Sequence, residues 1–138
     1  MRLDHVGVNV ADLDAAERWY CAAFGLRPEL RLRIEPIELD IAMLRHAELG
    51  HRVELLHRAG LAGGPRGANP AEAALLPGYS HMAFDVRRLD AEHARLVAQG
   101  AREVMAPQPS PEPGVRMSYL ADPDGNLVEL VERDPLPA

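Results

Sequence analysis

The stretch Val53-Glu54-Leu55-Leu56-His57-Arg58 decides the fold, because it returns 75 positions later as Val128-Glu129-Leu130-Val131-Glu132-Arg133. A second motif, His-apolar-x-apolar-x-Val, begins at His5 and again at His81, 76 positions later. The triplet Leu-Asp-Ala starts eight positions after each of these histidines. The chain is therefore predicted to contain two copies of one supersecondary unit, related by a pseudo-twofold axis.

Both copies have the pattern of a βαβββ module. In the first copy, alternating apolar residues at 3–10 predict a strand. Asp12 can cap a helix that runs to about Phe24 and ends at Gly25. Three further strands are expected near 29–35, 39–47 and 52–58.

A linker rich in Gly, Ala and Pro follows at 59–78, and Asn69-Pro70 starts a short helix within it. The second module repeats the plan, and its last two strands are joined by the turn Asp122-Pro123-Asp124-Gly125. We expect one domain over 1–138, with module 1 at about 1–58 and module 2 at about 79–133. The elements expected in module 2 are a strand at 79–86, a helix at 89–99, a short strand at 103–105, a Pro-rich loop at 107–113, and strands at 115–121 and 126–132.

The composition limits the class of protein. With 138 residues, 47% of them hydrophobic, the chain is long enough for one domain with its own core. A net charge of −6 argues against nucleic-acid binding, which uses a basic surface. No apolar run could cross a bilayer and no leader opens the chain, so we expect a cytoplasmic protein without a membrane partner. Cys21 is the single cysteine and lysine is absent, which excludes a disulfide framework, a thiolate-rich zinc site and Schiff-base catalysis.

Four residues at repeat-equivalent positions are candidate metal ligands: His5, Glu54, His81 and Glu129. Both glutamates lie between apolar residues on predicted strands, and a buried carboxylate is unfavourable unless it is paired or metal-bound. One such residue alone is more typical of a solvated edge strand, but four equivalent positions favour a metal site. Two imidazoles and two carboxylates neutralise a divalent cation and suit Ni, Co, Zn, Mn or Fe(II). The remaining histidines lack repeat partners and are expected at the surface: His46, His51, His57 and His93.

The chain also resembles the vicinal oxygen chelate superfamily, which includes glyoxalase I, methylmalonyl-CoA epimerase, extradiol dioxygenases and bleomycin and fosfomycin resistance proteins. The resemblance implies an α+β fold in which paired βαβββ modules form a cupped, eight-stranded mixed sheet around the metal. The matching segments are 5–10, Trp19-Tyr20, Phe24-Gly25, 53–56, 79–84 and 122–130, which together span nearly the whole chain.

The resemblance implies an enzyme. In glyoxalase I and the epimerase a divalent metal polarises a carbonyl, and a carboxylate removes the neighbouring C–H proton. Glu129 and Glu54 match the catalytic carboxylates, and both would also be metal ligands together with His5 and His81. The expected function is a divalent-metal-dependent isomerase, epimerase or lyase acting on a small molecule. We expect a homodimer, with the site built either within one chain or across the dimer.

Two other functions remain open. Extradiol dioxygenases of this superfamily bind Fe(II) through two His and one Glu, so a fourth ligand at Glu54 would crowd the positions for catechol and oxygen. Resistance-type members bind an antibiotic in the cup, with or without a metal, and perform no chemistry there. Metal analysis separates these classes.

Three further residues are candidates for substrate binding. Glu38 falls near the position of a second catalytic glutamate in the epimerase, and Arg52 offers charge to an anionic substrate. Tyr119 stands four residues before Pro123, where dioxygenases carry a tyrosine. Solvation of Arg52 and aromatic packing of Tyr119 are the alternative roles for these two residues.

Overall fold

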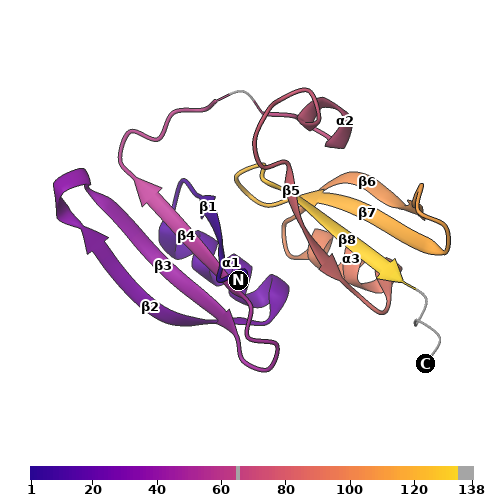
Figure 1. Ribbon diagram of the computed structural model, residues 1–138, viewed down its shortest axis with the longest axis horizontal. Coiled ribbons are helices and arrows are strands. Elements are labelled where there is room, and N and C mark those ends of the chain that lie inside the picture. The colour runs from indigo at the N-terminus through magenta and orange to yellow at the C-terminus, as the bar shows by residue number, and fades with distance from the viewer. Residues whose placement is uncertain (65, 134–138) are drawn as a thin grey trace. The chain divides into compact units, whose positions relative to one another are not determined.

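The computed structural model describes residues 1–64 and 66–133. The chain divides into two compact units, Met1–Gly63 and Gly64–Ala138, which are described separately as unit 1 and unit 2 (Figure 1). Each unit contains one four-stranded mixed sheet, so the eight predicted strands are all present. No helix among the described residues is long and apolar enough to span a membrane.

Unit 1 is a βαβββ module with the strand order β1-β4-β3-β2. Helix α1 begins where the Asp12 side chain accepts a hydrogen bond from the Ala15 amide, and it ends at Gly25, whose φ of 65° favours glycine. One stripe of this helix, including the fully buried Tyr20, forms the core of the unit with buried residues of β3 and β4 such as Leu55. The elements of unit 1 are β1 (Val6–Asn9), α1 (Leu13–Phe24), β2 (Leu26–Ile34), the 3-10 helix η1 (Glu35–Ile37), β3 (Leu39–His46) and β4 (Arg52–Arg58).

Unit 2 repeats this plan with the strand order β5-β8-β7-β6. The β7–β8 turn is held by one Asp122 carboxylate oxygen, which accepts hydrogen bonds from the backbone amides of Asp124 and Asn126 at 2.9 and 2.8 Å. Its elements are α2 (Pro70–Ala73), β5 (His81–Asp85), α3 (Leu89–Ala98), β6 (Arg102–Pro109), β7 (Val115–Ala121) and β8 (Leu127–Arg133).

The strand registers confirm that the two units are copies of one module. In unit 1, the parallel pair β1 and β4 places Gly7 opposite Glu54. In unit 2, the parallel pair β5 and β8 places Ala83 opposite Glu129. Gly7 and Ala83 each lie two residues after the histidine of their motif. The two copies of the sequence repeat therefore pair their strands in the same register. The α+β fold with two βαβββ modules expected from the sequence is therefore confirmed.

Two sequence expectations are wrong. The Pro-rich loop expected at 107–113 begins later, because β6 continues to Pro109. This strand lies at the sheet edge and its pairing with β7 is irregular between Met105 and Gln108, which is where prolines are tolerated in a sheet. His93 is not at the surface either. It shares the buried stripe of α3 with Leu89 and Leu96 and contacts Glu103 at 2.7 Å. The other three histidines expected at the surface are half-buried.

Candidate functional site

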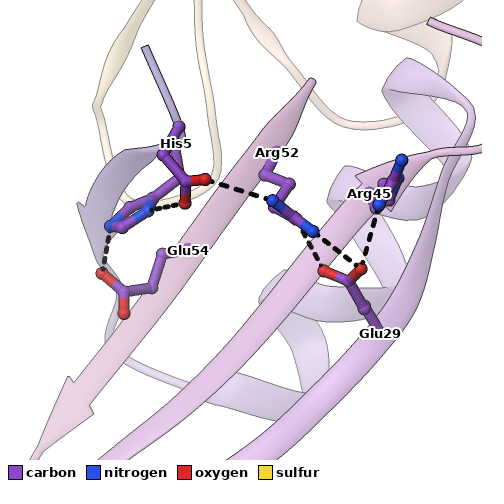
Figure 2. A network of polar contacts seen from close by, with 6 residues as sticks. His5, Glu29, Arg45, Arg52 and Glu54 are labelled. Carbon is purple, nitrogen blue, oxygen red and sulfur yellow. Dashed lines mark hydrogen bonds and ion pairs between the residues drawn. The ribbon is translucent and has the colours of Figure 1, made fainter. Parts of the chain in front are cut away.

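In unit 1 the predicted ligands His5 and Glu54 lie side by side (Figure 2). His5 directly precedes β1 and Glu54 lies on the adjacent strand β4, so the parallel pairing brings them together. The distance between His5 Nε2 and Glu54 Oε2 is 3.4 Å. A Cβ atom at Gly7 would lie 3.5 Å from the same carboxylate oxygen, which is an ordinary contact, and 3.2 Å from Cδ1 of Leu56, which is a tight one.

Unit 2 contains the equivalent pair, His81 and Glu129. His81 is the first residue of β5, and its Nε2 lies 3.2 Å from Oε2 of Glu129 on β8. Tyr119 on β7 stands directly opposite Glu129 in the antiparallel register. Its hydroxyl lies 3.4 Å from His81 Nε2, and the two rings pack edge to face with centroids 5.2 Å apart. The structure thus brings three of the residues singled out in module 2 into one cluster.

The second ring nitrogen of each histidine is also engaged. His5 Nδ1 lies 2.9 Å from a carboxylate oxygen of Asp4, and His81 Nδ1 lies 2.9 Å from the hydroxyl of Ser80. Asp4 and Ser80 occupy repeat-equivalent positions immediately before the histidines. Because β1 starts only at Val6, the side chains of Asp4 and His5 are not forced onto opposite faces of a strand.

These contacts shift the titration of several groups. The hydrogen bond that His5 donates to Asp4 raises the pKa of His5, and the nearby charge of Glu54 raises it further. The pKa of Asp4 is lowered by the hydrogen bond with His5 and by the charge of Arg52. Burial raises the pKa of Tyr119 to about 12, with further contributions from the charge of Glu129 and a hydrogen bond to it.

The contacts of His5 make the space beside Glu54 suited to a cation. A carboxylate only accepts hydrogen bonds, so a neutral His5 that is bonded to Asp4 carries its proton on Nδ1. The lone pair on Nε2 then faces a Glu54 oxygen at 3.4 Å, and two acceptors at this distance repel each other. A proton or a metal ion between them removes the repulsion. The donor set, one imidazole and one carboxylate in each unit, suits a divalent metal.

Within residues 1–64 and 66–133, no group of three or more His, Cys, Asp or Glu side chains forms a metal cage. Each unit by itself therefore presents two donors, His5 with Glu54 and His81 with Glu129.

The other two residues singled out for substrate binding have different surroundings. Arg52 forms a two-point ion pair with Glu29 and a third contact with Asp4, so its charge is already engaged (Figure 2). Glu38 is not on a strand. It follows η1 with a left-handed backbone, and its carboxylate is 70% exposed and lies 3.9 Å from Arg33. No contact joins it to the His–Glu pair among the described residues of unit 1.

Sequence reasoning missed Asp4, Ser80 and Glu29. The first two carried a signal, because they stand beside the motif histidines at equivalent positions of the repeat. Glu29 carried none: it lies at an irregularity in β2 between Pro28 and Leu30, which only the strand pairing reveals.

Comparison with known proteins identifies the family. The chain belongs to the Glyoxalase/Bleomycin resistance protein/Dioxygenase superfamily, whose family model matches residues 2–130. This confirms the resemblance stated from the sequence motifs.

Individual relatives are similar over nearly the whole chain. A putative lactoylglutathione lyase from Brassica oleracea var. gemmifera is 28% identical over 143 residues, which cover 99% of this chain and 46% of that protein, so the chain spans about half of its length. A probable lactoylglutathione lyase from Synechocystis is 23% identical over 96% of this chain and 95% of that protein. The crystal structure of a glyoxalase family protein from Bacillus cereus superposes with a TM-score of 0.76 and 26% identity, covering 96% of this chain and 93% of that chain.

Proposed function

We propose that this chain is a divalent-metal-dependent isomerase, epimerase or lyase, which acts by removing a proton next to a carbonyl of a small molecule. The observation that carries the proposal is the pair of equivalent His–Glu contacts, in which a histidine Nε2 faces a glutamate oxygen at 3.4 Å in unit 1 and at 3.2 Å in unit 2. The two similar proteins named as lactoylglutathione lyases support the same class of chemistry.

The metal would be held by His5, Glu54, His81 and Glu129. Two neutral imidazoles and two carboxylates balance the charge of Ni, Co, Zn, Mn or Fe(II). A bound divalent ion supplies Lewis acidity, which stabilises negative charge on a carbonyl oxygen. Among the described residues, unit 1 presents His5 and Glu54 side by side, and unit 2 presents His81 and Glu129.

Glu129 is the proposed base. Its carboxylate takes the proton as the C–H bond breaks, and the electron pair moves toward the carbonyl oxygen. Returning the proton to the neighbouring carbon gives isomerisation, and returning it to the opposite face of the same carbon gives epimerisation. Glu54 is the second proton carrier. Tyr119 is protonated at neutral pH, as an ordinary phenol is, and burial raises its pKa further to about 12, so its hydroxyl can serve as a hydrogen-bond donor to the Glu129 carboxylate.

The test combines metal analysis with isotope exchange. We expect stoichiometric divalent metal in the purified protein, and deuterium incorporation beside the carbonyl when 2-oxo and thioester compounds are incubated with it in deuterated water. Positioned acid–base groups contribute about 10²–10⁴-fold to rate, so Glu129→Gln should lose that factor of turnover while retaining its fold. Glu35→Gln, which alters an exposed carboxylate paired with Arg33, serves as the matched control.

Two outcomes would replace the proposal. Bound Fe(II) with oxygen-dependent cleavage of a catechol would assign the chain to the dioxygenases of the superfamily. Tight binding of an antibiotic without turnover would assign it to the resistance-type binding proteins.

A further inference from the structure

We propose that Asp4 is a positioning residue, which fixes the ring of His5 so that Nε2 points toward Glu54 and is available to a metal ion. The inference rests on the proposed metal site, but its first consequence, the tautomer of His5, is a property of the metal-free protein.

The contacts of Asp4 occupy both of its oxygens. Oδ2 accepts a hydrogen bond from Nδ1 of His5 at 2.9 Å, and Oδ1 accepts one from Nη1 of Arg52 at 3.2 Å. A neutral imidazole has one N–H, so the contact with Asp4 selects the tautomer that is protonated on Nδ1. The lone pair of Nε2 is then directed to the side of Glu54. Carboxylates that accept from the outer nitrogen of a metal-binding histidine fix its orientation and raise its basicity.

Asp4 is itself held by a chain of alternating charges (Figure 2). Arg52 donates through Nε and Nη2 to the two oxygens of Glu29, at 2.8 and 3.1 Å, which is a bidentate pair. Arg45 approaches the same carboxylate at 3.4 Å. Arg52 lies on β4 two residues before Glu54, and alternate residues of a strand share a face. Strand β4 therefore carries both Glu54 and Arg52, the arginine that binds Asp4.

Unit 2 lacks this chain at the equivalent positions. Ser80 replaces Asp4, and a hydroxyl can either donate or accept, so it does not select a tautomer of His81. The position equivalent to Arg52 is the buried Leu127. The contrast between the two copies of one module indicates that the charged support of His5 is a feature of this half of the molecule and not a by-product of the fold.

The tautomer is measured first, by nitrogen-15 NMR of histidine-labelled, metal-free protein at about pH 9, well above the ordinary histidine pKa of about 6.5. We expect His5 to be protonated on Nδ1 in the native protein and to shift toward the Nε2-protonated form in Asp4→Ala. Asp4→Asn keeps an oxygen acceptor without the charge and should rescue the tautomer in part. The control is Asp40→Ala, which removes a carboxylate that pairs with Arg33 away from the His–Glu pair.

Metal affinity is measured second, by competition of Zn²⁺ and Ni²⁺ with a chromophoric chelator. Partners of this kind typically contribute about 10–100-fold to metal affinity. Because Asp4 is 60% exposed, we expect a loss near tenfold in Asp4→Ala, and a smaller loss in Ser80→Ala. An unchanged tautomer of His5 in a folded Asp4→Ala protein would overturn the inference. A native protein that binds no metal but shows the expected tautomer change would overturn the proposed function and leave the positioning role of Asp4 supported.

Discussion

The hydroxyl of Tyr119 offers a sharp test of the site in unit 2. Tyr119 is 7% exposed, its hydroxyl lies 3.4 Å from His81 Nε2, and the residue stands directly opposite Glu129 on the neighbouring strand. Tyr119→Phe removes this oxygen and keeps the edge-to-face packing against the imidazole. A hydrogen bond to a charged group contributes about 1.5–3 kcal/mol, and about 1.36 kcal/mol corresponds to a tenfold change in rate. If the hydroxyl assists Glu129 in proton transfer, kcat should fall about 10- to 100-fold with little change in KM.

The equivalent position in unit 1 provides the matched control. Met43 stands opposite Glu54 as Tyr119 stands opposite Glu129, and its thioether offers no comparable hydrogen-bond donor. Met43→Leu conserves size and should change kcat by less than the tyrosine variant does. Initial rates over a range of substrate concentrations separate kcat from KM, and thermal unfolding checks that both variants fold. A folded Tyr119→Phe protein with native kcat would show that the side chain serves in packing alone.

Two further predictions concern the metal and acid stability. The double variant His5→Ala/His81→Ala should lose stoichiometric metal and activity while keeping its circular dichroism spectrum, because His5 precedes β1, His81 only begins β5, and both side chains are partly exposed. Full metal content in this variant would refute the ligand assignment. The free energy of unfolding should fall as the pH is lowered through 4.5 and 3.8, the ordinary values for Glu and Asp, because arginines lower the pKa of Glu112 and Asp90 in the folded state. The stability that a carboxyl group gains from a lowered pKa is present above its unfolded-state pKa and is lost below it. The free energy of unfolding is measured by urea titration at neutral pH and at about pH 3. Equal values at the two pH values would contradict the role of these ion pairs.

The features that the sequence predicted are those with a local cause. Helix α1 has a capping aspartate, one apolar stripe and a glycine in the left-handed region, so its limits at Leu13 and Phe24 follow from neighbouring residues. The hairpin at Asp122 is equally local. Predicting the His–Glu contacts required one further assumption, namely that the two copies of the motif pair their strands in the same way. The registers of Gly7 with Glu54 and of Ala83 with Glu129 agree with this assumption.

The features that the sequence did not predict depend on distant pairing. Prolines at 107 and 109 indicate a loop until β6 is known to be an edge strand. The ion pairs of Glu29 with Arg52 and Arg45 require the register of β2, β3 and β4 and the irregularity after Pro28. The sequence alone indicates that Arg52 could offer its charge to an anionic substrate, and the strand pairing adds that its guanidinium contacts Asp4 and Glu29 of its own unit.

Differences between the two copies of the module suggest how the proposed function divides between them. The donors are the same, but their neighbours are not: the His5 half has the charged chain through Asp4 and Arg52, and the His81 half has Ser80 and the hydroxyl of Tyr119. A histidine fixed by a carboxylate is a stronger and better oriented ligand. A neutral phenol that donates a hydrogen bond to a glutamate favours the ionised carboxylate, which is the form that a general base needs. Under the proposed function, substitutions at Asp4 should therefore act mainly on metal affinity, and substitutions at Tyr119 mainly on turnover.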